Sequence, residues 1–161
     1  MGWTFKKRLP CLELEYLAWK KEYLPVSVKG LRVLDIGAGE GETAKFFLDH
    51  GAKSVHCVEC DESLRECLMI NSERNGVTVR FGRFDPKIDL FGNVGYDFVK
   101  IDIEGYEESL LESPDLAVPA VVEVHGLQLA DKFEQKGWRV VRQGSEYGDL
   151  TSCTAYAYWR C

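Results

Sequence analysis

With 161 residues and a formal net charge of −6, the chain has the size of one ordinary domain and too few positive charges for general binding to nucleic-acid phosphates. Its hydrophobic content of 45% and charged content of 29% are typical of globular proteins and exclude a disordered or collagen-like chain. Charged residues interrupt every hydrophobic stretch and the N-terminus lacks the apolar core of a secretory signal, so we expect a cytoplasmic protein without a membrane-spanning segment.

The first predicted element is an amphipathic helix near the N-terminus. Its apolar stripe recurs at spacings of four, three and four residues and consists of Leu12, Tyr16, Trp19 and Tyr23. Pro25 is expected to end this helix. We assign residues 1–30, with the helix, and residues 31–161 to a single domain. The helix is expected to cover the sheet, and the alternative is a lid that shapes a substrate pocket.

From residue 31 onward, strands and helices alternate, which predicts an α/β fold. The expected strands are 31–36, 54–58, 77–81, 96–101, 120–124, 138–142 and 152–160. Helices are expected around 44–48, around 64–70 with Asp61 as the N-cap, at 107–111 and at 127–136, and only a short connection over 82–95. No helix precedes the last strand, which should therefore pair antiparallel with its predecessor. We expect a Rossmann-like, doubly wound, seven-stranded and mostly parallel sheet with an antiparallel last strand.

The strongest functional signal is the glycine-rich turn after the first strand, Asp35-Ile36-Gly37-Ala38-Gly39-Glu40-Gly41-Glu42-Thr43. Its glycines allow the backbone to approach a ligand closely. Gly41 follows Gly39 by two positions, whereas the dinucleotide fingerprint requires three. Glu40 and Glu42 would also repel a pyrophosphate. The loop therefore favours S-adenosylmethionine, which has no phosphate. Backbone N–H groups could bind its carboxylate, and Asp35 would favour its positive end.

Glu59 ends the second predicted strand, 20 residues after Gly39. An acidic residue at about this separation contacts ribose hydroxyls in nucleotide-binding folds. A carboxylate can accept both hydroxyl protons. We therefore predict that Glu59 binds the ribose of the cofactor.

Three segments resemble known methyltransferases. The glycine-rich turn is similar to the first motif of class I S-adenosylmethionine-dependent methyltransferases. The segments 98–107 and 123–126, which read FVKIDIEGYE and EVHG, resemble strand endings of the FkbM-type members. The resemblance covers about residues 31–160 and implies methyl transfer, often to a hydroxyl oxygen. It also implies a set of cofactor contacts: Gly37 and Gly39 at the methionine moiety, Glu59 at the ribose, and Arg83 and Phe84 at the adenine. Ala38, Cys60 and Asp102 are further expected cofactor contacts.

Methyl transfer from a sulfonium requires an oriented acceptor and at most one base. Asp102 and His125 end strands expected beside the cofactor strand, and either could accept a hydroxyl proton; Glu104 is a third candidate. Asp102 could instead position the cofactor, and His125 could be a packing group. Asp102, Glu123 and His125 could also bind a divalent metal, but they lack a diagnostic spacing, and we expect no metal.

Two alternatives to an S-adenosylmethionine-dependent methyltransferase stay open. A short chain could be a non-catalytic module that binds S-adenosylmethionine or S-adenosylhomocysteine and acts through a partner. A NAD-dependent oxidoreductase is disfavoured by the acids of the loop. Cys57 and Cys60 lack the second ligand pair of a zinc site, and we expect reduced thiols. The basic run at residues 6–8 leaves RNA binding open, although it fits a solvated chain end better.

Overall fold

The structure is a computed structural model that describes residues 2–6, 9–91, 95–112, 116–143 and 154–161, without the side chains of 9–13 and 91. The described residues form a seven-stranded sheet in the order β3-β2-β1-β4-β5-β7-β6. The strands are β1 Arg32–Ile36, β2 Ser54–Glu59, β3 Thr78–Phe81, β4 Phe98–Ile101, β5 Ala120–His125, β6 Arg139–Arg142 and β7 Thr154–Trp159. Strands β1 to β5 pair in parallel with their neighbours among these five, and β7 pairs antiparallel with both β5 and β6. The predicted fold class is confirmed.

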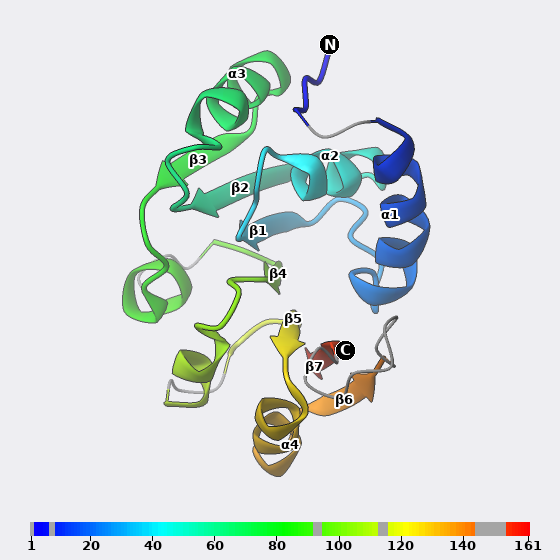
Figure 1. Cartoon of the computed structure of the whole chain (residues 1–161), viewed down its shortest axis with the longest axis vertical. Helices are drawn as coiled ribbons and strands as arrows, with labels where there is room; N and C mark the ends of the chain where they lie inside the picture. The colour runs from blue at the N-terminus through cyan, green and yellow to red at the C-terminus, as the bar shows by residue number, and fades with distance from the viewer. Residues whose placement is uncertain (1, 7–8, 92–94, 113–115, 144–153) are drawn as a thin grey trace.

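Helices cover both faces of this sheet (Figure 1). They are α1 Leu9–Glu22, α2 Glu42–Asp49, α3 Arg65–Asn75 and α4 Leu127–Gln135, with a π-helical turn η1 at Lys87–Phe91 and a 3-10 helix η2 at Glu107–Glu112. Figure 1 shows α1, α2 and α3 on one side of the sheet and α4 on the other. Within the described part of the chain, no helix has both the length and the apolar character that a membrane span needs.

Alternating strand residues supply two apolar cores. Val33 and Val121 belong to the core under α1 to α3, whereas Leu34 and Val122 belong to the core on the α4 side. Successive strand side chains point to opposite faces, so a strand covered on both faces reads as a continuous apolar run.

Helix α1 packs on α2 through aromatic rings. The ring of Phe46 lies 5.2 Å from that of Tyr16 and 5.7 Å from that of Trp19, both at steep edge-on angles. Both residues belong to the stripe that the sequence analysis identified. The predicted N-terminal helix is therefore present, and it covers the sheet by way of α2.

Three connections refine the sequence analysis. Asp61 is not the N-cap of α3: the helix begins at Arg65, and the Asp61 carboxylate accepts a hydrogen bond from the Ser63 N–H within the preceding turn. The connection between β3 and β4 is short, as expected, because η1 is its only helical turn among the described residues. Strand β7 does pair antiparallel with its predecessor, but it lies inside the sheet, and the predicted positions 152 and 153 fall outside the described residues.

Candidate functional site

The glycine-rich loop runs along the end of β4. Gly37 has a φ of +76°, and a Cβ placed on it would lie 1.6 Å from the carbonyl oxygen of Asp102. Only glycine combines this left-handed conformation with such a close approach to another backbone. The tight approach of β1 and β4 therefore depends on the absence of a side chain at this position.

A first cavity of about 430 Å³ opens at the carboxyl ends of β1, β2 and β4. It is lined by six of the predicted cofactor contacts, which are Gly37, Gly39, Glu59, Cys60, Phe84 and Asp102. Two of the three candidate bases, Asp102 and Glu104, line it as well. Val58, Leu64 and Ile103 add apolar walls. Ligands of open α/β sheets bind in such a crevice, because the strand order reverses beside β1.

Arg83 and Asp35 stand apart from this cavity. The Arg83 guanidinium lies 5.9 Å from the centre of the exposed Tyr106 ring and is not part of the cavity wall. Asp35 is fully buried beneath the loop, where the Thr43 hydroxyl donates a hydrogen bond to it. The structure thus brings Phe84, but not Arg83, to the cavity.

The Glu59 carboxylate is 8% exposed and holds the loop in place. Its Oε2 accepts a hydrogen bond from the Gly39 N–H at 2.8 Å, and its Oε1 accepts bonds from the N–H groups of Cys60 at 2.6 Å and Asp61 at 2.8 Å. A carboxylate has about four acceptor positions. Three of them are occupied within the protein, which leaves about one acceptor position open, and binding of the ribose by Glu59 stays a prediction.

A second cavity of about 500 Å³ adjoins the first and shares Gly37, Gly39, Leu64 and Asp102 with it. Ala38 lines this cavity. Its other acids are Glu15, Glu40, Glu42 and Glu123, and its rings are Trp19 of α1 and Tyr23, which follows the end of that helix. Helix α1 therefore both covers the sheet and lines a cavity, and its role as a lid over a substrate pocket stays a prediction.

A buried ion cluster lies under the loop. Lys100 is 1% exposed, and its ammonium donates to the Gly37 carbonyl at 2.9 Å and lies 3.3 Å from Oδ1 of Asp35. Burial acts to lower the pKa of Lys100, but Asp35, Asp102 and Glu123 outweigh it and raise the pKa to about 12. Lys100 is therefore protonated at neutral pH. The sequence analysis missed it, although a lysine within a fully apolar strand signals a buried partner.

His125 lines neither cavity, although its Nε2 lies 3.9 Å from Oε1 of Glu123, which lines the second one. Its Nδ1 lies 2.7 Å from Oε1 of the fully buried Glu107, which also accepts hydrogen bonds from the Gly105 N–H. The hydrogen bond to Glu107 raises the pKa of His125 to about 9. Beside it, the Tyr23 hydroxyl donates to Glu123, whose pKa is raised by burial and by the charge of Asp102. The cavity thus presents Glu123 and Asp102, whereas His125 holds a proton at neutral pH.

We expect the His125 ring to titrate near pH 9 when followed by NMR, and near its ordinary pKa of 6.5 in Glu107→Gln. Because the folded pKa lies above the unfolded one, the stabilisation from this pair is complete below pH 6.5 and is lost as the pH rises through 9. The wild-type protein should therefore lose more stability than Glu107→Gln between pH 7 and 10. A wild-type ring that titrates near 6.5 would contradict this assignment.

The structure also places the candidate metal ligands and two of the cysteines among the described residues. No three metal-ligating side chains gather there, and Asp102, Glu123 and His125 do not form a common ligand set. Cys57 is buried and Cys60 is exposed, and neither is in a disulfide.

No family model matches the sequence. Among solved structures, the chain is similar to fibrillarin from Aeropyrum pernix, solved with natively bound S-adenosyl-L-methionine, at a TM-score of 0.63 and 16% identity over 90% of this chain and 74% of that one. It is also similar to precorrin-6y C5,15-methyltransferase from Geobacter metallireducens, at a TM-score of 0.60 and 12% identity over 100% and 94% of the two chains. The fold is that of the class I S-adenosylmethionine-dependent methyltransferases. The FkbM subtype stays a prediction.

A sequence relative points to the same fold class. The ribosomal protein L11 methyltransferase of Thermotoga neapolitana is 28% identical over 146 residues, which cover 85% of this chain and 53% of the relative. The chain thus spans about half the length of the curated relative that it matches.

Proposed function

We propose that the protein is an S-adenosylmethionine-dependent methyltransferase that binds the adenosine of the cofactor in the first cavity. The methionine moiety lies at the junction of the two cavities, and the methyl acceptor binds in the second cavity. The observation that carries the proposal is the junction of the two cavities at Gly37, Gly39 and Asp102. A methyl group donated in one cavity has to meet an acceptor in the other, and these residues line both.

The first cavity suits the cofactor by size and by chemistry. A volume of about 430 Å³ lies within the usual range of small-molecule pockets. Phe84, Leu64 and Ile103 offer apolar walls for an adenine, and Glu59 has an acceptor position for a ribose hydroxyl. Asp102 supplies negative charge at the junction, where a positively charged sulfur is favoured. When bound, S-adenosylmethionine supplies a methyl group already activated by that sulfur.

We propose that Asp102 or Glu123 is the base that takes up the proton of the methyl acceptor, because both side chains line the second cavity. Burial and the charge of Asp102 raise the pKa of Glu123, which makes Glu123 a stronger base than an ordinary glutamate when it is ionised. His125 is not retained as a base, since its pairing with Glu107 keeps it protonated. Glu104 lines only the first cavity, on the cofactor side.

A hydroxyl oxygen stays the acceptor that the FkbM resemblance favours. The comparisons name other acceptors for other proteins, a ribosomal protein for the sequence relative and ring positions C5 and C15 for the precorrin enzyme. A methyl-transfer assay therefore needs small-molecule, protein and RNA pools. A non-catalytic binding module would bind the cofactor and transfer no label to any pool, and thermal shift with NAD would reveal an oxidoreductase.

We expect isothermal titration calorimetry to detect binding of S-adenosylmethionine, and Gly39→Arg to weaken it by more than about tenfold, because an arginine there fills the junction of the cavities. A Cβ on Gly39 meets only the end of the Glu42 side chain, so circular dichroism should show a folded variant. Gly76→Arg is the matched control, with a similar φ of +69° and open space around it. Unchanged affinity in Gly39→Arg would refute the placement of the cofactor.

A further inference from the structure

The N-terminal segment Trp3–Lys6 lies over the glycine-rich loop. The Thr4 N–H donates to Oδ1 of Asn71 at 2.8 Å, and Nδ2 of Asn71 donates to the Thr4 carbonyl at 2.7 Å and to the Glu40 carbonyl at 2.8 Å. The Lys6 N–H donates to Oε2 of Glu40 at 2.7 Å. Asn71 is fully buried, and Figure 1 shows the segment passing α3. These bonds tie the chain terminus to the loop, 34 residues later in the sequence.

The N–H groups of the loop are already used within the protein. Those of Gly37 and Ala38 donate to the Val58 carbonyl, that of Gly39 to Glu59, that of Glu40 to Glu42 and that of Gly41 to the Ala38 carbonyl. The expectation that these groups bind the cofactor carboxylate therefore does not hold for residues 37–41. A carboxylate placed here would also meet the negative charges of Glu40 and Glu42, so it requires a cation.

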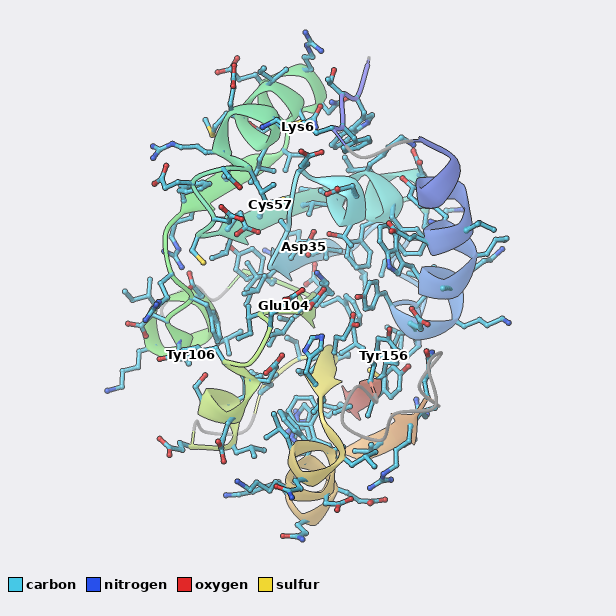
Figure 2. All side chains as sticks on the ribbon, viewed as in Figure 1. Lys6, Asp35, Cys57, Glu104, Tyr106 and Tyr156 are labelled. Carbon is cyan, nitrogen blue, oxygen red and sulfur yellow. The ribbon has the colours of Figure 1, made fainter. Side chains whose placement is uncertain are left out.

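Two cations line the second cavity among the described residues, Lys6 and Lys100. The Lys100 ammonium already donates a hydrogen bond to the Gly37 carbonyl and forms an ion pair with Asp35. The exposed Lys6 ammonium is held by a weaker interaction, because it donates a hydrogen bond to the neutral Ser63 carbonyl at 3.1 Å. Figure 2 shows Lys6 between α3 and α2, close to the loop. An ammonium that leaves a neutral carbonyl to bind a carboxylate gains free energy, because a hydrogen bond between two charged groups is stronger than one to a neutral acceptor.

We propose that Lys6 binds the carboxylate of the methionine moiety of the cofactor, so that the N-terminal segment completes the cofactor site. This inference rests on the proposed function. Lys6 lines the same cavity as Gly37 and Gly39, and these two glycines also line the first cavity, where we place the adenosine of the cofactor. The methionine moiety would then lie between the loop and the N-terminal segment. The carboxylates of the loop would lie near its positively charged groups, and the Lys6 ammonium would lie near its carboxylate.

The test compares two ligands that differ only in this carboxylate, S-adenosylmethionine and decarboxylated S-adenosylmethionine. Binding of each to the full chain is measured by calorimetry. We expect Lys6→Met to weaken S-adenosylmethionine by about tenfold and to change the affinity of the decarboxylated ligand by less than about twofold. Lys6→Arg should retain most of the affinity for S-adenosylmethionine. Lys53→Met, an exposed lysine before β2 at the other end of the strands, is the control and should change neither ligand.

Two results for Lys6→Met would overturn the proposal. Equal weakening of both ligands would mean that Lys6 only supports the loop, and unchanged affinity for S-adenosylmethionine would mean that it does not contact the carboxylate. Lys6→Gln serves as a second uncharged variant, and circular dichroism verifies that each variant folds. Failure of the wild-type protein to bind either ligand would instead refute the proposed function, and the inference with it.

Discussion

Replacement of Gly37 by alanine is expected to lower the free energy of unfolding by about 3–5 kcal/mol. A Cβ at this position would lie 1.6 Å from the carbonyl oxygen of Asp102, and φ is +76°, which side chains rarely adopt. Both obstacles are backbone, so no side chain can rotate away to relieve them. The ends of β1 and β4 must separate, and they form the floor of both cavities. Urea denaturation measures the loss, and cofactor binding should fall in the same variant.

Gly39→Ala is the matched control for this prediction. Its φ of +59° is also left-handed, but its Cβ would meet only Oε2 of Glu42, at 2.9 Å, at the end of a flexible side chain. We expect a loss of about 1–2 kcal/mol, from the backbone conformation alone. Equal losses of unfolding free energy in Gly37→Ala and Gly39→Ala would show that the close approach of β1 and β4 is not what requires glycine at position 37.

Replacement of Lys100 by methionine is expected to cost about 3–5 kcal/mol, because it leaves Asp35 as a buried charge without a cation. Asp35 is 0% exposed, and Oδ1 lies 3.3 Å from the ammonium that would be removed. Burial already raises the pKa of Asp35, and loss of Lys100 should raise it further. The folded variant would then bind a proton that the unfolded chain releases, so its stability should fall as the pH rises above about 4.

The double variant Asp35→Asn/Lys100→Met separates the charge effect from packing. Once Asp35 is neutral, the methionine leaves no buried charge, and we expect the double variant to be more stable at pH 7 than Lys100→Met alone. Denaturation of the wild type, both single variants and the double variant gives the coupling free energy. Additive losses would show that the two side chains do not act as a pair.

The elements of the fold could be predicted because their signals are local. Apolar runs of four to six residues, separated by glycines and amphipathic stretches, predict strands with both faces covered. The cap of α3 could not be predicted with the same security: an aspartate before a helix can cap it or close a turn, and here Asp61 bonds to Ser63. The position of β7 inside the sheet was equally hidden, since an antiparallel strand can add on either side of its predecessor.

The candidate site likewise contains residues that the sequence could predict and residues that it could not. The loop glycines and Glu59 carry their signal in residue type and spacing, because a close backbone approach demands glycine and a ribose favours a carboxylate. Lys100 was overlooked because its strand reads as apolar, and Glu107 because a glutamate in a short helix is usually exposed. The burial of Glu107 against His125 changes the charge state of a residue that the sequence analysis offered as one of three candidate bases.

The sequence by itself determined the layered α/β architecture, the place of the glycine-rich loop after β1 and the acid that meets it at the end of β2. These features depend on patterns within a few residues or between neighbouring strands. The tertiary structure alone decided which side chains share a cavity: Lys6 reaches the loop from the N-terminus, Tyr23 meets Glu123 across 100 residues, and Glu107 captures His125. Such pairings arise when distant segments pack together, and no local pattern in the chain encodes which partners will meet.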